Sequence, residues 1–164
     1  VTGYRRESFG DQMEQICRAF RQIIDDNPDC VLLYPVHLTP HVQRPGRQLL
    51  GVHSRIFLIE TVEYLPFIEL MRRSTLIITD SGGIQEEAPS LQKPVLITRR
   101  TTERPEAVEH GLARIVGTQT EAIVSQANRL LADAHEYQKM IAVQNPFGDG
   151  HASERIVGIL RGKL

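Results

Sequence analysis

Apolar residues recur along the chain in short continuous runs that alternate with stretches of helical spacing. The runs predict buried strands at 31–34 and 56–59, and further strands that start near Thr75, Pro94 and Ala113, 19 residues apart. A repeat of that length holds one strand, one short helix and two loops, which is typical of a compact βα unit.

Between these runs, the helical spacing predicts amphipathic helices at about 8–26, 62–73, 119–132 and 152–162. A loop is expected at 37–41 and a turn-rich break, without chemistry of its own, at 145–150. Apolar strands in alternation with helices favour an α/β fold, a Rossmann-like parallel sheet with helices on both faces. We expect residues 1–164 to form one such domain. Residues 1–3 resemble the end of a strand, which suggests an N-terminal partner domain.

Composition mainly excludes classes of function. The net charge of −1 gives no general attraction to nucleic acid or to an anionic membrane. Aromatic residues make up 5% of the chain and tryptophan is absent, which argues against a surface that stacks on bases. No apolar run approaches the ~20 residues of a membrane span, and no signal peptide is recognisable. Cys17 and Cys30 lack metal-binding spacing and are expected to be buried free thiols in a reducing compartment.

The candidate chemistry is concentrated after the apolar run that ends at Ile78. Ser81, Gly82 and Gly83 follow this run and precede a segment of helical pattern. A helix N-terminus beside glycine presents N–H groups and the positive end of the helix dipole to a phosphate. The same residues also suit an ordinary turn and helix cap. Neither the dinucleotide motif GxGxxG nor the P-loop motif GxxxxGK[ST] occurs in this region.

Charged residues on both sides of the next strand extend this candidate site. Glu86 and Glu87 are adjacent helical positions that point about 100° apart, so at most one of them faces a ligand. The alternative is that both are surface charges near a helix dipole. Arg99 and Arg104 lie in a loop that ends at Pro105, a residue suited to the first position of a helix. These arginines either bind phosphate in a bidentate manner or belong to a solvated loop.

Two further features have alternative explanations. His37 and His41 are separated by Pro40, and no third ligand can be assigned to them, so a polar ligand-binding loop is favoured over a zinc site. We therefore expect no metal and no cofactor. Phe67 either belongs to the core beneath its helix or stacks on a base.

Taken together, these motifs resemble the non-hydrolysing bacterial UDP-N-acetylglucosamine 2-epimerases. The resemblance is carried by residues 1–8, 34–38, 63–67, 79–111 and 145–150, of which 79–111 is the most specific block. It runs essentially end to end, but it covers only the C-terminal half of such an enzyme. It implies a glycosyltransferase-B architecture, with two Rossmann-like domains and the active site in the cleft between them.

The resemblance also implies roles for residues of the candidate site. Ser81, Gly82 and Gly83 would hold the diphosphate with backbone N–H groups and a hydroxyl. Glu87 would accept hydrogen bonds from the ribose, and Arg104 would contact the nucleotide or its phosphates.

Further roles are implied outside this block. Phe67 would lie against the uracil, and Arg5 and His37 would contact phosphate or a second, regulatory UDP-GlcNAc molecule.

The family motif Gly-His-Arg-Arg-Glu has Tyr4 at its histidine position here. The histidine acts in catalysis near the leaving phosphates, whereas tyrosine, with an ordinary pKa of ~10, supplies neither a cation nor a near-neutral base. Tyr4 is thus either a neutral donor or a sign of weakened chemistry, and Tyr4→His is expected to raise turnover of the complete enzyme.

The family inverts C2 of the sugar in UDP-GlcNAc to give UDP-ManNAc. It eliminates UDP to form 2-acetamidoglucal and then adds UDP back, using carboxylates that lie mostly in the N-terminal domain. The implied partners are therefore UDP or a UDP-sugar, the N-terminal domain and a second copy in a homodimer, without nucleic acid or membrane. The resemblance implies a cytoplasmic enzyme of cell-envelope polysaccharide biosynthesis, of which this domain alone is inactive. The alternatives are a hydrolase or glycosyltransferase of the same fold, and a non-catalytic module that binds nucleotide sugars.

Overall fold

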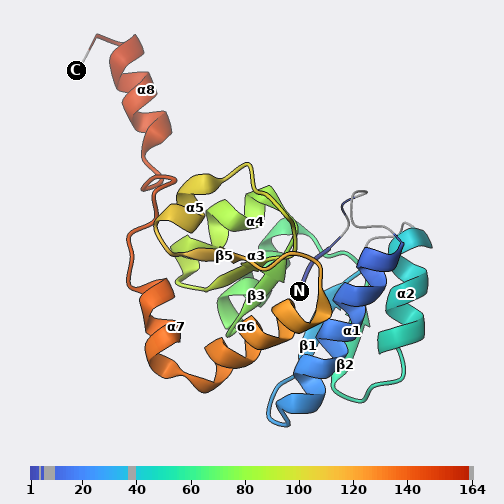
Figure 1. Ribbon diagram of the computed structural model, residues 1–164. Helices are drawn as coiled ribbons and strands as arrows, with labels where there is room; N and C mark the ends of the chain where they lie inside the picture. The colour runs from blue at the N-terminus through green and yellow to red at the C-terminus, as the bar shows by residue number, and fades with distance from the viewer. Residues whose placement is uncertain (4, 6–9, 37–39, 163–164) are drawn as a thin grey trace.

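The computed structural model describes residues 1–3, 5, 10–36 and 40–162, without the side chains of 40–43 and 45 (Figure 1). In this part of the chain the strands are β1 (Leu32–Pro35), β2 (Ile56–Ile59), β3 (Ile77–Thr79), β4 (Val95–Ile97) and β5 (Ala113–Ile115). The helices are α1 (Asp11–Asp26), α2 (Pro40–Leu50), α3 (Tyr64–Arg73), α4 (Gly82–Glu87), the 3-10 turn η2 (Ala88–Leu91), α5 (Pro105–Glu109), α6 (Thr120–Ala132), α7 (Ala134–Ile141) and α8 (Ala152–Leu160).

The N-terminal residues connect two groups of parallel strands, β1–β2 and β3–β4–β5. The Val1 nitrogen donates to the Leu33 carbonyl at 2.7 Å, and the Thr2 N–H donates to the Ile78 carbonyl at 2.9 Å. Thr2 also forms a parallel bridge with Thr79. The spatial order is therefore β2, β1, residues 1–3, β3, β4, β5, which is the doubly wound Rossmann order. The expectation that residues 1–3 belong to a strand end agrees with this pairing.

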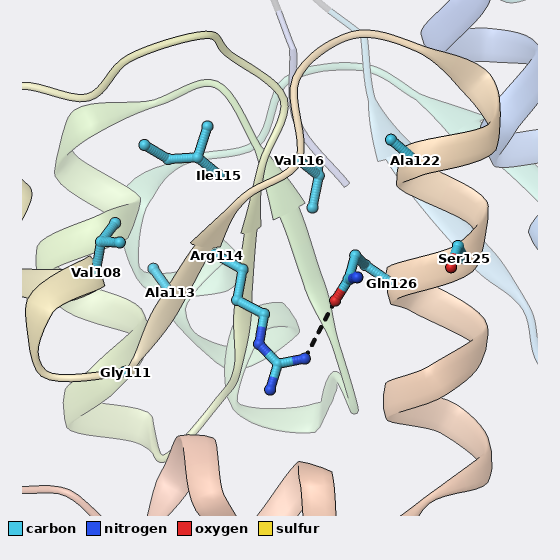
Figure 2. Close-up of a pocket in the computed structure, with 9 residues that line it drawn as sticks. All are labelled: Val108, Gly111, Ala113, Arg114, Ile115, Val116, Ala122, Ser125 and Gln126. Carbon is cyan, nitrogen blue, oxygen red and sulfur yellow. Dashed lines mark hydrogen bonds between the residues drawn. The ribbon is translucent and has the colours of Figure 1, made fainter.

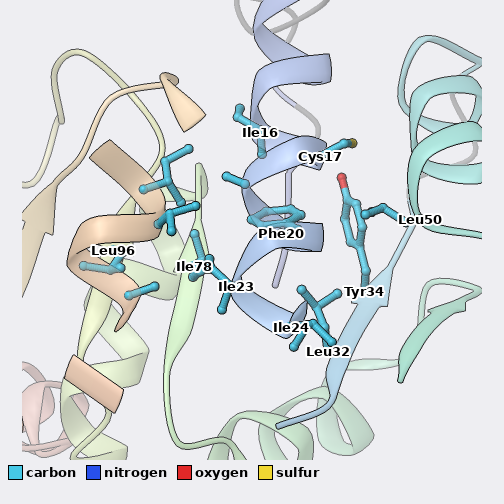
Figure 3. Close-up of a cluster of buried hydrophobic side chains, with 14 of the residues drawn as sticks. Ile16, Cys17, Phe20, Ile23, Ile24, Leu32, Tyr34, Leu50, Ile78 and Leu96 are labelled. Carbon is cyan, nitrogen blue, oxygen red and sulfur yellow. The ribbon is translucent and has the colours of Figure 1, made fainter. Parts of the chain in front are cut away.

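Helices cover both faces of the sheet. Neighbouring residues of a strand point to opposite faces, so they belong to different apolar clusters. Ile78 and Leu96 pack with α1 and α6 in one apolar cluster, where the rings of Phe20 and Tyr34 meet edge to face at 5.8 Å (Figure 3). Strand neighbours of these residues, including Ile77, join a second cluster with α3, α4 and α5. The predicted parallel sheet with helices on both faces is confirmed.

Two local predictions were wrong, and one helix was not predicted. The expected loop at 37–41 lies partly outside the described residues, and from Pro40 onward the chain is helical as α2. A further helix, α7, follows α6 almost without a break. Ile77 pairs with Val95 and Val95 with Ala113, so the strand repeat is 18 residues long instead of 19.

The last helix stands apart from the sheet. None of the residues of α8 is buried, and Figure 1 shows it projecting away from the other helices. Its exposed apolar side chains are Ile156, Val157, Ile159 and Leu160. Within the described residues, no helix is both long enough and apolar enough to cross a membrane.

Candidate functional site

The strand order places three polar segments at one edge of the sheet. The chain runs from residues 1–3 to β1 and β2 on one side, and from β3 to β4 and β5 on the other. The connections after residues 1–3 and after β3 therefore diverge, and such a switch point is where ligands of parallel sheets bind. Arg5 follows the first segment, Ser81 follows β3, and the arginine-rich loop follows β4.

A buried aspartate fixes Arg5 beside the loop that follows β3. Asp80 is 1% exposed, and its Oδ2 accepts a hydrogen bond from the Arg5 N–H at 2.8 Å. A Cβ atom on Gly82 would lie 4.0 Å from Nη2 of Arg5. The Arg5 guanidinium thus lies next to the Ser-Gly-Gly segment, as expected of a phosphate contact.

Ser81 is the N-cap of α4, but its side chain makes no capping hydrogen bond. Its backbone is extended, and its N–H donates to the Thr79 hydroxyl at 3.0 Å. A plain capping serine would instead accept a hydrogen bond from an N–H group of the first helical turn. The Ser81 hydroxyl therefore does not cap α4.

The loop after β4 carries an ion-pair chain that reaches Arg5. Both guanidinium Nη atoms of the buried Arg99 donate to Glu103, at 2.5 and 2.9 Å. Glu103 also pairs with Arg5 at 3.5 Å. These contacts, above all the hydrogen bonds from Arg99, lower the pKa of Glu103 to about 2. Glu103 therefore stays ionised and holds the Arg5 side chain toward this loop.

Arg104 lies at the N-terminus of α5, where Pro105 occupies the first turn as predicted. Its Nε forms an ion pair with Glu86 of α4, and its Nη1 donates to the Glu103 carbonyl at 3.0 Å. The guanidinium is thus oriented by Glu86 of α4, although Arg104 and Glu86 are 18 residues apart in the sequence. An arginine held in this way is prepared to bind an anion with little loss of side-chain entropy.

Glu86 and Glu87 diverge, as their adjacent helical positions required. Glu87 accepts a hydrogen bond from the Tyr64 hydroxyl of α3 at 3.4 Å, and its carboxylate raises the pKa of Tyr64. Phe67, one turn further along α3, is half-buried and packs against the second apolar cluster. Phe67 therefore has a core contact, whereas its predicted role beside a uracil stays a prediction.

Two polar side chains that tie these segments together were not predicted from the sequence. Gln85 is fully buried and makes side-chain hydrogen bonds to Ser81 and to Thr102 of the arginine-rich loop. Asn145 donates to the Glu86 carbonyl at 3.2 Å and to the Ser90 hydroxyl at 2.6 Å. The segment 145–150 is therefore more than a turn, because it anchors the back of α4. Nothing in the local pattern around either residue indicated these long-range contacts.

An open pocket of about 580 Å³ lies elsewhere, between β5 and α6 (Figure 2). Its cation, Arg114, donates to Gln126 at 3.2 Å and to the buried carboxylate of Glu136 at 2.9 Å. This pocket lies away from the switch point of the sheet, and Gln126 and Glu136 hold its guanidinium in place. The segments around Ser81 and Arg104 fit the chemistry of a nucleotide better than this pocket does.

Some predicted positions are not described. Tyr4 and His37 lie outside the described residues, and the side chain of His41 is likewise not described. Among the described residues, no three His, Cys, Asp or Glu side chains come together in a way that could hold a metal ion.

The chain is similar to known proteins over almost its whole length. The family model described as UDP-N-acetylglucosamine 2-epimerase matches residues 1–161. The UDP-N-acetylglucosamine 2-epimerase of Escherichia coli K12 is 53% identical over 161 residues, which are 98% of this chain and 43% of that protein.

Two solved structures are also similar over nearly the whole chain. S. aureus MnaA, solved with UDP, has a TM-score of 0.94 and 44% identity over 99% of this chain and 46% of its own. UDP-GlcNAc 2-epimerase from Neisseria meningitidis, bound to UDP-GlcNAc, has a TM-score of 0.94 and 43% identity over 98% of this chain and 43% of its own. The predicted fold class, a Rossmann-like sheet of the glycosyltransferase-B type, is confirmed by such neighbours.

The chain spans less than half the length of these relatives. Its match to the family model nevertheless extends over almost every residue. The chain therefore belongs to the UDP-N-acetylglucosamine 2-epimerase family.

Proposed function

We propose that the complete protein interconverts UDP-GlcNAc and UDP-ManNAc, and that this chain supplies the UDP-binding half of the active site. The observation that carries the proposal is the placement of Arg5 beside Gly82 at the switch point of the sheet, together with the ion pair that ties Arg104 to α4. Relatives that are more than 40% identical to this chain over the matched region were solved with UDP or UDP-GlcNAc, which supports the same ligand class here.

In the proposed site, the diphosphate lies against the N–H groups of Ser81, Gly82 and Gly83 and accepts from the Ser81 hydroxyl. Arg104 contacts the nucleotide or its phosphates. Backbone N–H groups at the start of α4 add the positive end of a helix dipole. Fixed donors of this kind stabilise negative charge as it develops on a leaving group, with little reorganisation during the reaction.

Sugar and base contacts complete the proposed nucleotide site. Glu87 accepts from the ribose hydroxyls, and Phe67 lies against the uracil. Arg5 is proposed to contact phosphate or a second UDP-GlcNAc molecule, together with His37.

The proposed reaction has two steps. Loss of the C2 proton to a base and cleavage of the C1–O bond to UDP give 2-acetamidoglucal and free UDP. UDP then adds back at C1 while a proton reaches the opposite face of C2. The residues of this chain act on the departing and returning UDP, and the carboxylates that move the C2 proton are proposed to belong to an N-terminal domain.

The complete protein is proposed to contain two Rossmann-like domains around a cleft and to form a homodimer. The relatives are more than twice as long as the matched segment, which leaves room for a second domain. The exposed apolar side chains of α8 offer a surface that such a domain can cover.

Product analysis of the complete protein tests the proposed reaction. Incubation with UDP-GlcNAc is expected to yield UDP-ManNAc, and incubation with UDP-ManNAc to yield UDP-GlcNAc at the same final ratio. Release of free sugar and UDP would instead indicate a hydrolase, and transfer to an added acceptor would indicate a glycosyltransferase. Tight binding of UDP-GlcNAc without any product would indicate a sensor of nucleotide sugars.

A further inference from the structure

The two segments of the proposed nucleotide site, around Ser81 and Arg104, are joined by a continuous series of hydrogen bonds through a buried side chain. The N–H of Arg104 donates to the Thr102 hydroxyl at 3.0 Å, and that hydroxyl donates to Oε1 of Gln85 at 2.5 Å. Nε2 of Gln85 then donates to the Ser81 carbonyl at 3.1 Å. Each link therefore has a defined donor and acceptor, from the N-terminus of α5 to the N-terminus of α4.

These hydrogen bonds fix the orientation of the Thr102 hydroxyl and of the Gln85 side-chain amide. The hydroxyl of Thr102 accepts from a backbone N–H, so its own proton points to Gln85. The amide of Gln85 must consequently present its oxygen to Thr102 and its NH₂ group to Ser81. A buried amide without partners is costly, and Gln85 is fully buried with both ends bonded.

We infer that Gln85 and Thr102 are positioning residues that set the spacing between Ser81 and Arg104, so that a diphosphate meets both segments at once. The inference rests on the proposed nucleotide site. Neither residue needs to touch the ligand, because each acts through the backbone of a residue that does. The ion pair between Glu86 and Arg104 is a second link between the same segments. Loss of the hydrogen bonds through Gln85 and Thr102 therefore weakens the site without destroying it.

Two substitutions of Thr102 separate the hydroxyl from its packing. Thr102→Val keeps the shape but removes the hydroxyl, and it is expected to weaken UDP binding roughly 3- to 10-fold, as for loss of one or two net hydrogen bonds. Thr102→Ser keeps the hydroxyl and is expected to bind UDP within about 2-fold of the unmodified chain. An equal loss of UDP affinity in Thr102→Val and Thr102→Ser would overturn the inference. Unchanged UDP affinity of Thr102→Val would also overturn it.

A matched control removes a comparable hydroxyl elsewhere. Thr120 at the start of α6 is buried and donates to the carbonyl and side chain of Gln15 in α1, outside this series of hydrogen bonds. Thr120→Val is expected to lower the melting temperature while leaving UDP affinity unchanged. A loss of UDP affinity in this control matching that of Thr102→Val would show that general destabilisation explains the effect.

A double-mutant cycle tests whether the two residues act as one unit. Gln85→Met and Thr102→Val together are expected to lose no more UDP affinity than the more severe single variant. Additive losses would overturn the coupling.

A readout without nucleotide distinguishes failure of this inference from failure of the proposed function. In the NMR spectrum, Thr102→Val is expected to shift the side-chain amide of Gln85 and the backbone amides of Ser81 and Gly82, whereas Thr102→Ser is not. If the unmodified chain bound no UDP, the proposed UDP site would fail in this chain, and these shifts alone would decide the coupling. If the amide resonances of Gln85, Ser81 and Gly82 did not shift in Thr102→Val, the coupling between Thr102 and Ser81 would be overturned.

Discussion

Glu136 of α7 is buried among three cationic side chains from different parts of the chain. Its carboxylate pairs with Arg114 at 2.9 Å, Arg129 at 3.0 Å and Lys139 at 2.9 Å. The hydrogen bonds from Lys139 and Arg114 lower the pKa of Glu136 to about 2 from its ordinary value of 4.5. One acidic side chain thereby fastens α6 and α7 to the edge strand β5.

This depressed pKa predicts how stability depends on pH. Because the folded pKa of Glu136 lies below the unfolded value, its stabilisation is complete above pH 4.5 and is lost as the pH falls toward about 2. Glu136→Gln is expected to lower the melting temperature near neutral pH and to flatten its fall in acid. Thermal unfolding measured over that pH range checks this, with the exposed Glu121→Gln as control. If the melting temperatures of the unmodified chain and of Glu136→Gln fell in parallel as the pH was lowered, the expectation would be contradicted.

Single residues differ in how far the sequence predicts their role. Ser81 and Arg104 were predicted because each directly follows or precedes a recognisable element. Gln85 and Asn145 were not, because their partners lie across the fold at Thr102 and Ser90. A hydrogen bond between distant segments leaves no periodic signal in the sequence.

At the scale of elements, the turn between η2 and β4 contains a strained residue. Gln92 has φ of 54° and ψ of 46°, the left-handed conformation that L side chains disfavour. Hydrogen bonds from Gln92 N–H to the Pro89 carbonyl and from Lys93 N–H to the Ala88 carbonyl, at 3.0 and 3.1 Å, hold it there.

Glycine at this position is expected to stabilise the fold. Gln92→Gly removes the Cβ clash and should raise the free energy of unfolding by about 0.5–1 kcal/mol, after the entropy cost of glycine is subtracted. Gln92→Ala keeps a Cβ and serves as the control, since it loses the same exposed side chain without relief of strain. Chemical denaturation of the three proteins measures the effect. A glycine variant less stable than the alanine variant would contradict it.

Two helices show where sequence patterns fail. α2 contains Pro45 and Gly46, which argue against a helix, but packing of its buried Leu50 against the α1 cluster outweighs them. α7 had a usable signal, because Asp133 and Glu136 have the spacing of a capping box. The Asp133 carboxylate indeed accepts from the N–H groups of residues 135 and 136.

At the scale of the whole molecule, the C-terminal segment has two parts with different roles. Asn145 bonds to the back of α4, and Phe147 packs against the second apolar cluster. Beyond them, α8 buries none of its residues. Stability should therefore depend on the first part and not on the second.

Two truncations test this division. Removal of residues 151–164 is expected to leave the melting temperature within about 2 °C of the full chain, because none of the described residues 151–162 is buried. Removal of residues 144–164 also deletes Asn145 and Phe147 and should lower the free energy of unfolding by about 1–3 kcal/mol. Thermal unfolding of both shortened chains checks this. An equal loss of stability in the two would show that α8 contributes to the fold.

The alternation of apolar runs and helical stretches predicted the architecture because a doubly wound sheet imposes that pattern on every strand and helix. The pattern of apolar residues did not predict that residues 1–3 pair between β1 and β3, because strand order depends on contacts between residues far apart in the sequence. That pairing creates the switch point at which Arg5 and Ser81 meet.

A calorimetric titration of the 164-residue chain with UDP, with ADP as control, tests the proposed nucleotide site most directly. We expect UDP to bind in preference to ADP, and Arg104→Ala and Glu87→Ala each to weaken that binding at least about 10-fold, as for loss of a charged hydrogen-bond partner. Equal binding of UDP and ADP, or UDP binding unaffected by both substitutions, would contradict the assignment of the site to this edge of the sheet.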